Sequence, residues 1–141
     1  MSTTGLPIFD TTVQETNLWL KSLMAHMHSE DRHLAYLALR STLHALRDRL
    51  GPESAVHLAA QLPMLVRGLY FEGWHMAGTP TKERTRADFF EHVRSELPPS
   101  SAIDPNLAAR AVFEVLVEKL DRGQIDKVID RMPAELRELW P

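Results

Sequence analysis

The sequence predicts an all-α protein, a compact helical domain of two tandem four-helix repeats of about 70 residues each. Two observations support this prediction. Apolar residues recur at spacings of three and four, as on one face of a helix, and no stretch alternates between apolar and polar residues as a half-buried strand does. The chain also matches itself without a gap when it is shifted by 70 positions.

The first two predicted helices are long. One runs from about Thr11 to Met27, and the other extends to about Leu50 with Ser29 as its expected N-cap, because a serine side chain can accept a hydrogen bond from the first turn. Gly51 is expected to end the second helix, since glycine is the residue most often found just after a helix.

Two short helices are expected next, and each begins at a proline. Proline favours the first helical position, so Pro52 and Pro63 predict two helix starts, the second leading to about Phe71. Residues 73–82 contain two glycines and a proline, and they predict a loop.

The second half of the chain repeats this order. Thr85 is the expected cap of a fifth helix, and Asp104 followed by proline predicts the start of a sixth that runs to Arg122. Gly123 is expected to end it. A short seventh helix follows, and Pro133 predicts the start of the last one.

The self-match aligns more than hydrophobic residues. The most informative pairs are Arg40 with Arg110, Pro63 with Pro133, Arg67 with Arg137, and Tyr70 with Trp140. A chance match of two amphipathic helices would not align prolines and arginines as well. We therefore predict one domain, residues 1–141, with repeats at about 10–74 and 85–141, a linker at 75–84 and a pseudo-twofold relation between the units.

Composition narrows the class of protein. The 141 residues are 44% hydrophobic and 25% charged, as expected for a globular domain. The absence of cysteine excludes disulfides and thiolate sites and predicts a cytoplasmic protein. No apolar run is long enough for a membrane span, and no signal peptide is recognised. The net charge of −3 makes nucleic acid an unlikely partner.

Several short motifs resemble a known family. They are residues 58–63 (LAAQLP), 67–70 (RGLY), 72–74 (EGW) and the closing 132–141 (MPAELRELWP). Together they resemble the bacterial family known as domain of unknown function 2267, from about Phe9 to Pro141. The resemblance implies a small bacterial all-helical protein, and it carries over no activity, cofactor or site residue.

One candidate site for a ligand or partner lies at the end of the fourth helix. It comprises Arg67, Tyr70, Glu72, Trp74 and His75, which combine an anion-binding guanidinium with large aromatic side chains. Arg67 and Tyr70 have counterparts in the second unit, and the arginines are interpreted mainly as structural anchors that satisfy helix-end carbonyls or pair with acids. Trp74 and His75 have none, which makes them the better functional candidates.

A second candidate is a polar stripe on the second helix. His33, Tyr36, Arg40, His44 and Arg47 are spaced by three and four, so they lie on one face opposite the leucines. The stripe is either a solvated face or a surface that binds a partner.

Histidines near the first helix junction are a third candidate. His26, His28 and His33 have Glu30 and Asp31 between them, and histidine with carboxylate can bind metal. Their spacing does not place them on one helix face, so a polar helix junction is preferred and no metal is expected.

No catalytic motif stands out, and the chain has no phosphate-binding glycine loop and no G-x-S-x-G sequence. The preferred hypothesis is a non-enzymatic interaction or structural module without a cofactor, whose partner is an unknown protein or a second copy of the chain. One alternative is a small-molecule or cofactor binder with a cleft near Arg67, Tyr70 and Trp74. Another is a histidine-based metal site.

Overall fold

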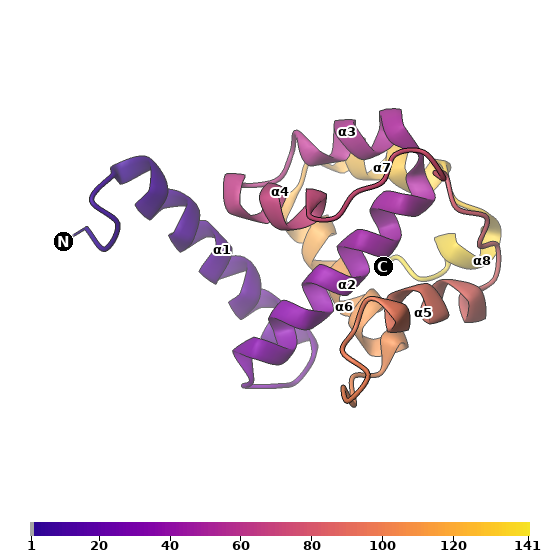
Figure 1. Cartoon of the computed structure of the whole chain (residues 1–141), viewed down its shortest axis with the longest axis horizontal. Helices are drawn as coiled ribbons and strands as arrows, with labels where there is room; N and C mark the ends of the chain where they lie inside the picture. Colours follow the sequence, from indigo (N-terminus) through magenta and orange to yellow (C-terminus); the bar gives the residue numbers. More distant parts are fainter. Residues whose placement is uncertain (1) are drawn as a thin grey trace.

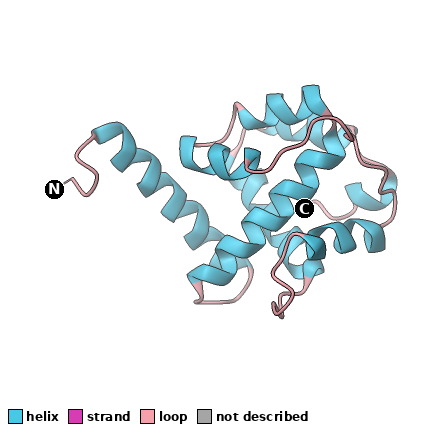
Figure 2. Cartoon of the chain, viewed as in Figure 1, coloured by secondary structure: helices cyan, strands magenta, loops and turns pink. Residues whose placement is uncertain are grey.

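The computed structural model describes residues 2–141, which form eight α-helices and no strand (Figures 1 and 2). The all-α prediction is confirmed. The helices are α1 Pro7–His26, α2 Arg32–Leu50, α3 Pro52–Ala59, α4 Met64–Phe71, α5 Arg86–Ser95, α6 Pro105–Lys119, α7 Arg122–Asp130 and α8 Ala134–Arg137.

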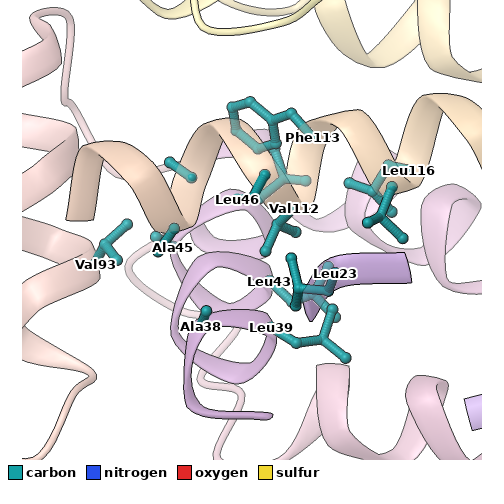
Figure 3. Packing of buried hydrophobic residues seen from close by; sticks show 14 of the residues in the cluster. Leu23, Ala38, Leu39, Leu43, Ala45, Leu46, Val93, Val112, Phe113 and Leu116 are labelled. Atoms are coloured by element: carbon teal, nitrogen blue, oxygen red, sulfur yellow. The ribbon is translucent and has the colours of Figure 1, made fainter. Parts of the chain in front are cut away.

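Helices α2 and α6 form the centre of the protein. They pack against each other, and both are also covered by α1 and α5. Figure 3 shows Leu43 and Leu46 of α2 beside Val112 and Leu116 of α6, all fully buried. Each such side chain contributes about 1.5–3 kcal/mol of hydrophobic stabilisation.

The shorter helices surround this centre. Helix α4 packs on α1 and α2, while α8 packs on α5. Helices α3 and α7 contact each other, and each also contacts the long helix that precedes it. All the elements share one core of buried apolar residues that extends from Trp19 to Trp140.

Several predicted helix starts are confirmed. The Thr85 side chain accepts a hydrogen bond from the Asp88 N–H, and Asp104 accepts one from Asn106. Helix α1 begins at Pro7 rather than Thr11, since Pro7 itself occupies the first turn.

The start of α2 differs from the prediction. The N-cap is Asp31, whose carboxylate accepts hydrogen bonds from the N–H groups of His33 and Leu34, so the prediction of Ser29 is wrong. The Ser29 N–H instead bonds to the Met24 carbonyl across 3.0 Å, and His28 adopts a φ of 53°. Ser29 therefore belongs to the turn that closes α1, which is a common helix ending.

The end of α6 also differs. The helix stops at Lys119, and Asp121 caps α7 by accepting a hydrogen bond from the Gln124 N–H. Gly123 lies inside α7, so its predicted role as a helix stop is wrong. A capping aspartate two residues earlier already separates the two helices.

The N-terminal half of α1 extends away from the rest of the protein (Figure 1). Ile8 and Phe9 are exposed there, and the first buried residue of α1 is Trp19. Thr12 connects this half to α4, because its hydroxyl oxygen accepts a hydrogen bond of 2.9 Å from the Leu65 N–H.

No helix within residues 2–141 has the length and apolar character that crossing a membrane requires.

Candidate functional site

The polar stripe of α2 is partly internal. His44 is 1% exposed and Arg47 is 3% exposed, because α4, α5 and the loop between them cover this side of α2. The expectation that all five residues share one solvated face is therefore wrong for these two. Tyr36 lies at the surface and stacks on His33 with ring centroids 6.0 Å apart, and these two remain a predicted partner surface.

Arg47 donates three hydrogen bonds to oxygen atoms inside the protein. Its Nη1 donates to the carbonyl oxygens of Tyr70 at 2.8 Å and Glu72 at 2.9 Å. Its Nε donates to Asp48 Oδ1 at 2.9 Å. A buried guanidinium is stable only when its donors are paired, and here they secure the C-terminal end of α4 against α2.

His44 connects three elements through its two ring nitrogens. Nε2 lies 2.8 Å from the Leu69 carbonyl oxygen at the end of α4, and Nδ1 lies 3.1 Å from Glu96 Oε2 at the end of α5. Each ring nitrogen of His44 therefore faces an oxygen of a different element. The hydrogen bond from His44 is the main reason why the pKa of Glu96 lies below its ordinary value.

Arg40 is half-buried at the edge of the same network. Its Nη2 lies 2.8 Å from Glu72 Oε1, and its Nη1 donates to the Glu96 backbone carbonyl at 3.3 Å. Both Arg40 and Glu72 were predicted site residues, and the structure pairs them with each other.

Further along α2, four side chains form what we call the His92 cluster: Asp48 of α2, Glu83 of the loop, His92 of α5 and Glu96, which directly follows α5. His92 Nε2 lies 3.3 Å from Asp48 Oδ2, and its Nδ1 pairs with Glu83 Oε1. Asp48, His92 and Glu96 each offer one ligand atom, and these atoms lie within 4.8 Å of one another.

The electrostatics of the cluster follow from these contacts. The pKa of His92 is raised, mainly by its hydrogen bond to Asp48. Burial acts in the opposite direction, but the hydrogen bonds to Asp48 and Glu83 together outweigh it. Burial alone would raise the pKa of Asp48, but hydrogen bonds from His92 and Arg47 hold it below its ordinary value. The pKa of Glu83 is lowered in the same way, against burial, by His92 and Thr81.

Sequence reasoning missed this cluster. One local signal was available, since His44 and Asp48, like His92 and Glu96, are four residues apart and so share a helix face. Nothing in the sequence indicated that these two faces meet.

Arg67 bonds to helix-end carbonyls, as predicted for the arginines, and Tyr70 also bonds to a backbone carbonyl. Arg67 donates to the carbonyl oxygens of Ala59 at 3.0 Å and Leu62 at 2.9 Å, at the end of α3. The Tyr70 hydroxyl donates to the Ala55 carbonyl at 2.8 Å, and burial raises the pKa of this phenol far above its usual range.

Trp74 and His75 lie in the loop after α4. The Trp74 ring packs on Phe71 with centroids 5.2 Å apart, and its indole N–H is buried with no hydrogen-bond partner among residues 2–141. His75 is exposed. No hydrogen bond links these two residues to Arg67 or Tyr70 in the described part of the chain.

The histidines near the first helix junction have separate neighbours. His26 lies between two carboxylates of α6, with Nδ1 facing Glu114 and Nε2 at 2.5 Å from Glu118. His28 is exposed, and His33 stacks on Tyr36. The hydrogen bond from Ser22 is the main cause that lowers the pKa of Glu118.

An apolar groove of about 360 Å³ lies between α1, α2 and α4. We call it the α1–α4 groove. Exposed Leu65 and Tyr36 contribute to its walls, and Gly68 faces open space there, because a Cβ on it would meet no atom within 4 Å. The residues that line the groove are Thr16, Leu20, Tyr36, Leu39, Leu65, Val66, Gly68, Leu69 and Glu72.

The fold and its sites define a cysteine-free, all-helical domain with internally paired arginines and histidines. The chain belongs to the family described as uncharacterized conserved protein, domain of unknown function 2267, whose model matches residues 16–139. The resemblance noted from the sequence is thus confirmed. No curated protein matches the chain. The family assigns no specific activity.

Proposed function

We propose that this protein is a non-enzymatic helical interaction module and that its partner is a second copy of the same chain. The observation that carries this proposal is the projecting N-terminal half of α1. Ile8 is 59% exposed and Phe9 is 45% exposed there, although both residue types are usually buried. Neighbouring exposed apolar side chains on one protein mark an interaction site.

The projecting segment is additional to the family domain. The family match begins at residue 16. A shift of 70 positions pairs α1 with α5, and α5 begins at Arg86, which is the counterpart of Thr16. Residues 7–15 of α1 therefore have no helical counterpart in the second half. A segment that the repeated fold does not require, and that nonetheless exposes apolar side chains, favours a role in association.

The α1–α4 groove supplies the complementary surface. It is mostly apolar, and Leu65 on its wall is 48% exposed. We infer that a twofold axis relates the copies, so that the segment around Ile8 and Phe9 of each copy covers the groove of the other. Such an isologous contact closes as a dimer, the commonest form of symmetric assembly.

The proposal includes the internal architecture predicted from the sequence. Residues 1–141 form one domain of two tandem four-helix repeats, at about 10–74 and 85–141 with a linker at 75–84, related by a pseudo-twofold axis. The helix contacts support it, because α1 packs on α6 as α5 packs on α2. Arg67 and Arg137 support it too, since each donates to the carbonyl five residues earlier, of Leu62 and Met132.

Ion pairs between the units give further support. His26 of α1 pairs with Glu114 of α6, and Glu96, directly after α5, pairs with His44 of α2. A shift of 70 positions maps His26 onto Glu96 and His44 onto Glu114. The same two junctions are therefore occupied by acid–histidine pairs in which the two residue types have exchanged positions.

The alternatives have less support. Arg67 and Tyr70 use their polar groups on carbonyls of the chain itself, which leaves little to hold a small molecule near Trp74. The net charge of −3 does not favour a nucleic acid. The cytoplasmic location and bacterial source remain predictions from the sequence.

Light scattering coupled to size exclusion, at micromolar concentrations of the full chain, tests the proposal. We expect a dimer for the wild type and a monomer for the double variant Ile8→Asp/Phe9→Asp. Gly68→Gln places a side chain in the α1–α4 groove, so it should also weaken the dimer while leaving the helical circular dichroism unchanged.

Leu107→Asp is the matched control, because Leu107 is 41% exposed on α6 outside the groove. This variant should remain dimeric. A wild-type chain that is monomeric throughout the micromolar range would refute self-association. Dissociation by Leu107→Asp to the same extent as by the α1 variant would place the interface elsewhere.

A further inference from the structure

We propose that Asp48, His92 and Glu96 bind one divalent transition-metal ion, with Zn²⁺ as the best-suited probe. The inference is independent of self-association, because the His92 cluster lies between α2, α5 and the loop at 72–85 and shares no residue with the projecting half of α1.

The ligands converge because of helix periodicity. His92 and Glu96 are four residues apart at the end of α5, so both side chains face α2, which supplies Asp48. One ligand atom from each lies within 4.8 Å of the others, so small side-chain rotations bring all three to bonding distance of about 2.0–2.2 Å from one ion.

Each ligand is also oriented by a neighbour, which distinguishes the cluster from a chance group of charges. Glu83 binds His92 Nδ1 and thereby turns Nε2 toward Asp48. A carboxylate on the outer nitrogen of a histidine is the usual support for a metal-ligating ring.

The two carboxylate ligands are supported in the same way. Arg47 donates to Asp48 Oδ1 at 2.9 Å, while Asp48 Oδ2 lies toward His92, and His44 Nδ1 lies 3.1 Å from Glu96 Oε2. Both supporting side chains are almost fully buried, so they hold the carboxylates in fixed positions.

The loop that carries Glu83 is fixed to α2. The Thr81 N–H donates to the Asp48 carbonyl at 2.9 Å, and Arg49 Nε donates to the Glu83 carbonyl at 2.7 Å. Glu83 therefore reaches His92 from a backbone that two hydrogen bonds hold beside the cluster.

The ligand types select the class of ion. Metal binding displaces the proton from His92 Nε2, and two carboxylates with the resulting neutral imidazole have a total charge of −2, which balances a divalent cation. Imidazole favours zinc, iron and similar metals over magnesium and calcium, which prefer oxygen ligands alone. Three protein ligands leave a position for water or a further group, as in zinc sites that are not purely structural.

His26 also lies between two carboxylates, but it lacks the third converging ligand that the His92 cluster has. Its two carboxylates, Glu114 and Glu118, bind opposite nitrogens of the ring, so they cannot converge on one ion. In the His92 cluster, by contrast, Asp48, His92 and Glu96 supply three candidate ligand atoms that lie close together. His26 is therefore a control of the same residue type and similar ionic surroundings.

The test is titration of the chelator-treated full chain with ZnSO₄, with affinity measured by competition against a chromophoric zinc indicator. We expect one Zn²⁺ per chain, and no measurable binding for His92→Asn or for Glu96→Gln. Glu83→Gln should weaken binding by about 10–100-fold, because it removes only the support of the ring. His26→Asn should bind as the wild type does.

A second readout separates ligation from stability. Co²⁺ in the same site should give visible absorption typical of four or five ligands, and this absorption should disappear in His92→Asn, with circular dichroism confirming that the variant is folded. Excess Mg²⁺ should not displace Zn²⁺. Failure of the wild type to bind Zn²⁺, or equal loss of binding in His26→Asn, would overturn the proposal.

Discussion

The guanidinium of Arg47 donates a hydrogen bond to the carbonyl oxygen of Tyr70 across 2.8 Å, in the interior of the protein. Arg47 lies on the polar side of α2, which sequence periodicity places opposite the leucines. The contact therefore shows that both sides of α2 are internal near its C-terminal end. The apolar side packs on α6, and the polar side fixes the backbone that leaves α4.

Replacing Arg47 with methionine should destabilise the protein strongly. The change leaves the carbonyls of Tyr70 and Glu72 without their donor and the half-buried Asp48 without its cation, so we expect a loss of about 3–5 kcal/mol in the free energy of unfolding. Urea denaturation measures it. Arg94→Ala removes only an exposed ion pair and should cost about 0–1 kcal/mol. Similar losses for both variants would contradict the anchoring role of Arg47.

Arg67→Ala and Arg137→Ala should have matching effects. Each removes charge-assisted hydrogen bonds to carbonyls at the end of the preceding helix, so each should lower the free energy of unfolding by about 1.5–3 kcal/mol. Thermal and urea unfolding of both variants check this. Arg122→Ala, which breaks an exposed pair with Asp126, serves as the control with a small effect. A negligible effect of either anchor variant would argue against equivalent roles.

Alanine should have opposite effects at two glycines. Gly51 has a φ of 83°, and its added Cβ would lie 3.4 Å from Pro80 Cδ, so Gly51→Ala should cost about 1–3 kcal/mol. Gly68 lies inside α4 with open space around it, so Gly68→Ala should stabilise by about 1 kcal/mol through helix propensity. Melting temperatures that move in the same direction for both would refute the conformational argument.

Tyr70 should make stability fall at alkaline pH. Burial raises its pKa, so the folded protein keeps the phenolic proton at pH values where the unfolded chain has lost it. The free energy of unfolding therefore decreases as pH rises above about 10, the ordinary pKa of tyrosine.

Tyr70→Phe tests this directly. At neutral pH it should cost about 1 kcal/mol, because the hydrogen bond to the Ala55 carbonyl is lost. Above pH 10 its stability should decline less steeply than that of the wild type, as measured by urea unfolding across pH. Parallel pH profiles for the two proteins would show that Tyr70 is not the group responsible.

Much of the fold could be predicted because its signals are local. Thr85, Asp104, Pro52 and Pro133 lie within one residue of helix starts, where the capping side chain or proline ring acts on its own first turn. The wrong predictions for Ser29 and Gly123 arose where two candidate signals for a helix boundary lie close together. At α2, Asp31 lies directly before the first helical residue, so it caps the helix in place of Ser29.

The helices, most of their starts and the anchoring role of Arg67 could be predicted from sequence, since each depends on groups within about one or two helical turns. Which polar residues are internal depends on how distant helices pack together. His44 and Arg47 are buried, and Asp48 meets His92, because α4, α5 and their loop pack over one side of α2. Helical periodicity defines the face of a single helix, and it contains no information about which distant segment will cover that face.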